Sequence, residues 1–316
     1  MFPTGVKNTP DESRHESRIP NPESRLLTRA YLAWLTVCLV WGTTYLAIRI
    51  ALESIPPLLM AAMRYTTAGT ILAVMLRARG ERLPGPRAWP SLVVLGVLLL
   101  GFGNGGVVWA EQTVPSGLTA VLVATSPFWI TGLDVTLGGE RLTPRRWIGL
   151  LTGFAGIVAL VWNDLQVGDR RAFLVGVVAS QVACVGWAIG SLYARRRGHS
   201  HAREENVLAT AAFEMLFGGL ALFGAAAVHH EYGSLTFTVR SASAIGYLIV
   251  FGAVVGFTAY AYALKHLPVA TVSLYAYVNP VIAVFLGVLI LNEPFGARDV
   301  MAAAVVFAGV ALVRQP

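Results

Sequence analysis

Apolar residues fill most of the chain from residue 30 onward, in runs separated by short polar or charged connections. Each run is close to the about 20 residues that an α-helix needs to cross the hydrocarbon core of a bilayer. The pattern therefore predicts an all-α membrane protein with ten transmembrane helices. The expected helices cover residues 30–50, 56–76, 88–109, 113–136, 147–163, 172–194, 206–228, 241–263, 268–291 and 299–313.

The amino-acid composition favours the same class of protein. Of the 316 residues, 55% are hydrophobic and only 13% are charged, a balance that a water-soluble globule would struggle to cover with polar side chains. A soluble multidomain enzyme is therefore disfavoured. Both cysteines, Cys38 and Cys184, lie inside apolar runs, so no disulfide framework is expected.

The positions of the 24 Lys and Arg residues predict the orientation of the chain. Residues 1–29 are rich in Pro, Ser, Glu and Arg and are expected to form a disordered cytoplasmic tail. With this tail in the cytoplasm, 18 Lys and Arg residues lie on the cytoplasmic side and four on the other side. The positive-inside rule then predicts a multi-pass plasma membrane protein with both termini on the cytoplasmic side. Because these loop charges explain the net charge of +7, no nucleic-acid partner is expected.

An internal repeat divides the chain into two halves. A shift of 153 residues places residues 110–160 on residues 263–313 without a gap. We therefore expect two five-helix units, at residues 30–163 and 172–314. Because each unit has an odd number of helices, the second is inverted relative to the first, and a substrate is expected between them near the membrane midplane.

Four short motifs resemble the EamA-domain branch of the drug/metabolite transporter superfamily, in its YedA-like group of inner-membrane exporters. They are WGTTYLAIR at Trp41–Arg49, GNGG around Asn104, AEQTVPSG at Ala110–Gly117 and AYVNPVIAVFLG at Ala276–Gly287. The resemblance covers about residues 30–314. It implies ten helices in two inverted EamA repeats, cytoplasmic termini and the export of amino acids or other small metabolites.

Two charged residues lie in the middle of predicted spans, where a charge is costly unless it has a partner or a watery cavity. Arg64 and Glu214 are repeat mates at an offset of 150 residues. We expect them to face one cavity and to pair directly, through water or through a zwitterionic substrate. On this hypothesis Glu214 binds protons, the candidate coupling ion, or a cationic group, and Arg64 holds a carboxylate. The alternative is a structural ion pair between the halves.

Asn104 lies in a cluster of glycines that formally matches the dinucleotide fingerprint GxGxxG, although the context is an apolar helix without a preceding strand. The glycines predict close helix packing or local unwinding. Asn104 then contacts either the substrate or a neighbouring helix. Aromatic side chains expected at the same cavity are Trp41, Trp187, Trp109, Tyr275 and Tyr277, with a lipid-facing position as the alternative.

Pro127 and Pro280 are repeat mates in the middle of spans and are expected to kink or unwind them. Asn279 is expected to bond the backbone groups that Pro280 frees. These residues suit the hinges of a rocking transporter, although packing alone also explains them. Glu111 lies near a span end, where a solvated surface position is favoured, and Glu140 and Glu293 are expected to cap helices or form ion pairs.

These features predict a secondary transporter that exports a small organic metabolite, such as an amino acid or a drug-like amphiphile, by alternating access across the inner membrane. We expect a monomer or weak dimer with no cofactor and no metal. No phosphate-binding loop, metal motif or nucleophile elbow indicates an enzyme. The alternatives are a membrane-embedded enzyme and a structural or receptor-like membrane protein.

Overall fold

The computed structural model describes residues 22–137, 143–164, 169–201, 206–267, 272 and 274–314, and the regular elements among them are helices. The first half contains α1 (Pro22–Ala51), α2 (Pro57–Ala78), α3 (Trp89–Leu95), η1 (Gly96–Asn104), α4 (Gly105–Ala110), α5 (Ser116–Val123), α6 (Ser126–Thr136) and α7 (Pro144–Asp164). The second half contains α8 (Arg170–His201), α9 (Val207–Val228), η2 (Glu231–Ser234), α10 (Val239–Tyr247), η3 (Leu248–Val255), α11 (Gly256–His266), α13 (Tyr275–Leu291) and α14 (Ala297–Arg314).

Seven helical segments of the described chain are long and apolar enough to cross a membrane, whereas the sequence predicted ten spans. The shorter apolar helix Tyr275–Leu291 has 17 residues, fewer than the about 20 of a usual span. The all-helical membrane class is therefore confirmed at this coarser level. The seven segments are Leu26–Ala51, Pro57–Ala78, Trp89–Ala110, Ser116–Thr136, Arg170–Ala194, Val207–Val228 and Val239–Ala263.

Helix α1 begins inside the segment that was predicted to be a disordered tail. Its first described residue is Pro22, so the prediction is corrected for residues 22–29, while residues 1–21 lie outside the description. The local sequence explains the early start, since Pro22 and Glu23 are residue types that favour the first turn of a helix.

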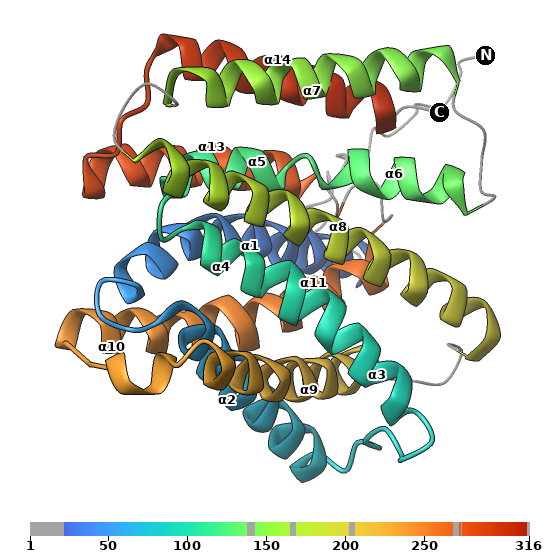
Figure 1. The fold of residues 1–316 in the computed structure, drawn as a ribbon. Helices are drawn as coiled ribbons and strands as arrows, with labels where there is room; N and C mark the ends of the chain where they lie inside the picture. The colour runs from blue at the N-terminus through green and yellow to red at the C-terminus, as the bar shows by residue number, and fades with distance from the viewer. Residues whose placement is uncertain are drawn as a thin grey trace, which may run out of the picture.

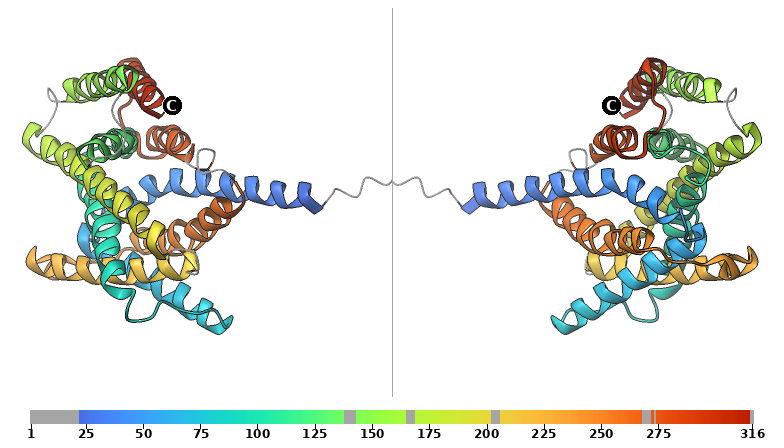
Figure 2. Two further views of the ribbon diagram at one scale, coloured as in Figure 1. Left: turned by 90° about the vertical axis from the view of Figure 1, so that its right-hand side faces the viewer. Right: turned by 90° about the vertical axis from the view of Figure 1, so that its left-hand side faces the viewer.

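Helices from the two halves pack in corresponding pairs. The α2–α9 pair lies at one edge of the bundle and the α7–α14 pair at the other, as Figures 1 and 2 show from perpendicular directions. Between them, α1 packs against α11 and α13 of the second half. Its repeat mate α8 packs in the same way against η1, α4, α5 and α6 of the first half. This reciprocity is what a duplicated sequence is expected to give.

Each half contains a π-helical segment, in which the turn is wider than in an α-helix. The segments are η1 and η3, which occupy corresponding places between α3 and α4 and between α10 and α11. Segment η1 packs against α8 and α9, and η3 packs against α2. The clustered glycines had predicted a local irregularity near Asn104, whereas the η3 segment was not anticipated. Because π-helical turns are frequent at functional sites, these segments direct attention to the space between the halves.

The two mid-span prolines have different effects on their helices. Before Pro127 a turn at Ala124 and Thr125 interrupts the helix and separates α5 from α6, although both residues keep αR backbone angles. At Pro280 the helix α13 continues without interruption, so the unwinding predicted there is not observed. With its amide nitrogen turned toward them, Asn279 donates to Tyr275 O and Cys38 O, each at 3.1 Å. Neither is the carbonyl of Ala276, which the missing proline N–H frees, so these bonds are not the ones predicted for Asn279.

Candidate functional site

A cavity of about 430 Å³ lies between helices of the two halves. Its walls come from α1, α2, η1 and α4 to α6 of the first half and from α8, α11 and α13 of the second. The sequence predictions placed many site residues near such a space. Those that line it are Trp41, Arg64, Asn104, Pro127, Trp187, Tyr275, Asn279 and Pro280.

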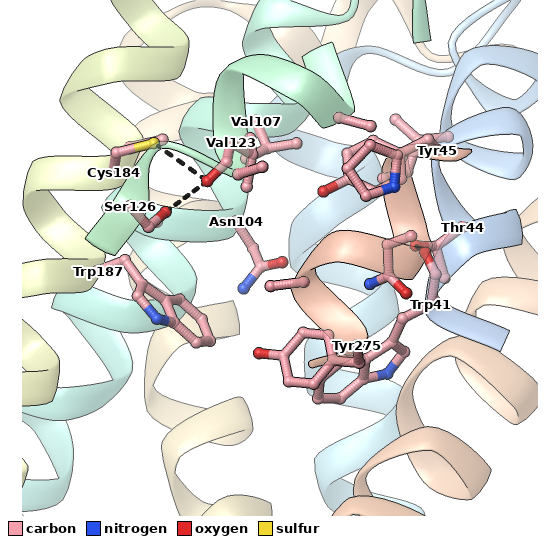
Figure 3. Close-up of a pocket in the computed structure, with 18 of the residues that line it drawn as sticks. Trp41, Thr44, Tyr45, Asn104, Val107, Val123, Ser126, Cys184, Trp187 and Tyr275 are labelled. Carbon is pink, nitrogen blue, oxygen red and sulfur yellow. Dashed lines mark hydrogen bonds between the residues drawn. The ribbon is translucent and has the colours of Figure 1, made fainter. Parts of the chain in front are cut away.

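Aromatic rings form facing walls of this cavity. In Figure 3, Trp187 stands on one side and Trp41 with Tyr275 on the other, and the Asn104 amide lies between them. The Trp41 ring packs against Tyr275, with 5.0 Å between ring centroids, and its Nε1 donates to Gly252 O at 3.1 Å. That carbonyl belongs to η3, so one π-helical segment fixes the orientation of a cavity-lining ring.

Trp187 and Asn104 make the corresponding contacts with the other π-helical segment. A Cβ atom at Gly103 would lie 3.2 Å from Trp187 Cε3, which shows how closely the ring approaches η1. Asn104 Nδ2 donates to Leu99 O at 3.2 Å, a bond within its own wide helical turn. The hydrogen bond to a neighbouring helix that was considered for Asn104 is therefore not the one observed.

Arg64 places a buried positive charge in the cavity wall. Its side chain is 4% exposed, and its Nε has no hydrogen-bond partner among the described residues. The guanidinium carbon lies 4.9 Å from the centroid of the Tyr65 ring, a cation–π contact. Because arginine stays protonated in proteins, this part of the cavity is a favourable position for an anionic group.

Glu214 does not share this cavity, contrary to the sequence prediction. It is half-buried on α9, where its backbone lies beside Gly96 of η1, and it is absent from the cavity lining. Arg64 lies beside Gly252, where an added Cβ would meet its Nη2 at 3.1 Å. The side chain of Arg64 is thus close to η3, whereas the backbone of its repeat mate is close to η1.

Trp109 and Tyr277 also lie outside the lining. The Trp109 ring packs against His229 with 5.1 Å between centroids and borders a second, surface cavity of about 540 Å³. The Tyr277 ring packs against Phe307 of α14 at 6.0 Å. On α13 the residues at positions 276, 279 and 280 share the helix face that lines the cavity, and residue 277 projects from another face.

Sequence reasoning missed several residues of the site. Thr44, Tyr45, Tyr65 and Phe257 line the cavity, but none of them carries a charge that singled it out. Thr44 and Tyr45 lie in the WGTTYLAIR motif, which was the available signal for these two residues. Glu111 was predicted to be solvated and is instead 0% exposed. The available signal was the AEQTVPSG motif itself, which contains this acid, but the sequence alone gave no reason to bury it.

Glu293 caps a helix, as predicted. Its carboxylate accepts from Ser116 N at 2.9 Å, Ser116 Oγ at 2.8 Å and Gly117 N at 3.2 Å, at the N-terminus of α5. Glu231 does the same for α2 by accepting from Leu58 N at 3.3 Å and Leu59 N at 2.9 Å. Glu140 lies outside the described residues. Each observed carboxylate sits where the helix dipole stabilises negative charge.

Replacing Glu293 by alanine is expected to destabilise the protein by about 2 kcal/mol, because the first N–H groups of α5 lose charged acceptors. The apparent melting temperature of the detergent-solubilised protein measures this effect. Asp299→Ala is a suitable control, since Asp299 accepts from Gly296 N at 2.7 Å in an exposed position. An equal loss in both variants would contradict the role assigned to the Glu293 cap.

Comparison with known proteins identifies the family. The model of the EamA-like transporter family matches residues 28–162 and 174–315. The chain belongs to this family. Two matched segments within one EamA-like chain agree with the repeat seen in the sequence.

Individual proteins similar to this chain include transporters and one protein of solved structure. The EamA-like chain is 35% identical to the inner membrane transporter YedA of Escherichia coli over 290 residues, which covers 92% of each protein. It is 22% identical to the transporter YoaV of Bacillus subtilis, covering 90% of this chain and 96% of YoaV. A solved crystal structure with 23% identity has a similar fold, with a TM-score of 0.63 over 90% of this chain and 97% of the other.

The cavity of this EamA-like protein has a mixed aromatic and polar lining. It combines aromatic rings with the amides of Asn104 and Asn279 and one guanidinium group, that of Arg64. Among the residues that the structure describes, no group of three His, Cys, Asp or Glu side chains is arranged to hold a metal ion.

Proposed function

We propose that this protein is a secondary transporter that exports a small organic solute bearing a carboxylate across the inner membrane by alternating access. The observation that carries the proposal is the buried guanidinium of Arg64 in the wall of a cavity that both halves enclose. An anionic group of the solute would neutralise this charge, while the rings of Trp41 and Trp187 would cover its apolar part. The inner-membrane location is supported by the name of the relative YedA.

The same proposal includes the full topology. With α7, α13 and α14 added to the seven apolar segments, the chain has ten spans, five in each of two inverted units. The family matches at residues 28–162 and 174–315 support units at residues 30–163 and 172–314. Both termini are assigned to the cytoplasm in this proposal on the positive-inside rule. Pro127 and Pro280 would serve as hinges between the two access states of a monomer or weak dimer.

Transport into liposomes tests the proposal. The purified full-length protein is reconstituted and offered labelled N-benzoylglycine, which carries a ring, an amide and a carboxylate, or its uncharged amide. We expect saturable flux of the carboxylate that exceeds flux of the amide by at least about tenfold, since the charged hydrogen bonds to Arg64 are worth about 1.5–3 kcal/mol. If neither compound entered the liposomes that contain the protein faster than it entered protein-free liposomes, transport of this solute class would be refuted.

A further inference from the structure

Glu111 is a fully buried acid to which the proposal above gives no role. It directly follows the candidate span Trp89–Ala110, and its side chain is 0% exposed. Neither carboxyl oxygen has a hydrogen-bond partner among the described residues. The backbone N–H of Glu111 donates to Val107 O at 3.1 Å. Because Val107 lines the cavity, Glu111 lies one helical turn beyond the cavity wall.

Ionisable groups from three other segments face Glu111. Arg49 of α1 donates to its backbone carbonyl oxygen. Arg64 of α2 and Glu293 of the segment before α14 are near enough to act on the carboxyl group electrostatically. Tyr45 of α1, which lines the cavity, is near enough to respond to a charge on Glu111. The acid is therefore linked electrostatically to the cavity-lining residues Arg64 and Tyr45 and to the helix cap Glu293.

These surroundings favour the neutral acid. Burial and the like charge of Glu293 raise the pKa of the Glu111 carboxyl well above its ordinary value, while Arg49 and Arg64 act in the opposite direction. An ionised carboxylate without a donor would lose its hydration with no compensating bond.

The acid at position 111 is not part of the internal repeat. The 153-residue shift places Leu264 at the corresponding position of the second half, so the acid occurs in one half only. Buried titratable groups beside a cavity are typical of functional sites.

We propose that Glu111 is the proton-binding residue that couples solute movement to a pH gradient. This inference rests on the proposed transport function. Glu111 keeps its proton while the surrounding helices are packed as they are here and exchanges it with water when they separate. The step is a proton transfer between water and a carboxylate, without oxidation or reduction. Arg49 and Arg64 are placed to stabilise the ionised form once water enters.

The first test measures proton binding on the unmodified protein. Dicyclohexylcarbodiimide reacts with protonated carboxyl groups in apolar sites, and mass spectrometry locates the adduct. We expect the reconstituted full-length protein to be labelled at Glu111, at a rate that falls as the pH rises. The matched variant Glu214→Gln should keep this adduct and Glu111→Gln should lose it. An unlabelled Glu111, or a labelling rate that does not change with pH, would overturn the proposal, because a coupling residue must meet its proton.

The second test measures coupling with N-benzoylglycine in the same liposomes. A gradient of one pH unit is a tenfold ratio of proton activity, so it is expected to change wild-type flux about tenfold, whereas flux through Glu111→Gln follows the solute gradient alone. Glu214→Gln should respond like the wild type. A full response in Glu111→Gln would overturn the inference while leaving the transport function intact. If no protein moved the compound, the transport function would fail and the carbodiimide result would still decide proton binding.

Discussion

Replacing Arg64 by glutamine is expected to abolish the preference for a carboxylate solute over its amide. Glutamine keeps a long polar side chain in the cavity wall but removes the charge. Removing one partner of a buried ionic contact costs about 2–5 kcal/mol, which corresponds to an about 30-fold or larger rise in the Kd for the anion. Fluxes of N-benzoylglycine and of its amide through the reconstituted variant measure the effect.

Two further variants distinguish binding from folding. Arg64→Lys retains the charge without the planar fork and should recover part of the preference, because lysine cannot form the paired hydrogen bonds of a guanidinium group. Glu81→Gln is a matched control at a residue whose carboxylate accepts from Asn206 Nδ2 at 3.2 Å on the exposed surface. Flux of the amide should remain comparable in all of these proteins. A preference for the carboxylate that survived in Arg64→Gln would show that the anion binds elsewhere.

Adding a single methyl group at Gly96 is expected to separate two helices of the bundle. A Cβ atom there would lie 2.5 Å from Glu214 O and 2.8 Å from Gly218 N, and both atoms belong to the backbone of α9. Backbone atoms cannot move aside as a flexible side chain can, so Gly96→Ala should cost about 1–3 kcal/mol. We expect the apparent melting temperature in detergent to fall by several degrees.

The same π-helical segment provides a matched control. At Gly101 an added Cβ would meet no atom closer than 3.9 Å. Gly101→Ala should therefore leave the melting temperature unchanged or raise it slightly, because alanine in a helix adds at most about 1 kcal/mol to the free energy of unfolding relative to glycine. This comparison holds the chemical change and the helix constant and varies only the contact with α9. Equal melting temperatures for the two variants would show that η1 and α9 do not pack as closely as described.

The internal repeat predicted the positions of some site residues correctly and of others wrongly. Trp41 and Trp187 are repeat mates, and both line the cavity. Arg64 and Glu214 are also mates, yet only Arg64 lines the cavity, because symmetry relates their surroundings without requiring that the two side chains meet. Tyr277 was placed in the cavity on proximity along the chain, although its position on α13 directs it toward Phe307.

The sequence by itself determined that the chain is helical, apolar enough for a membrane, duplicated and a member of a transporter family, since hydrophobic run length and repeated motifs are properties of the chain alone. Only the tertiary structure decided which mid-membrane charges face the cavity, where the helices widen, and that Glu111 is buried rather than solvated. The physical reason is that burial and pairing depend on how the faces of distant helices pack together, and close contacts such as Gly96 with α9 settle that geometry.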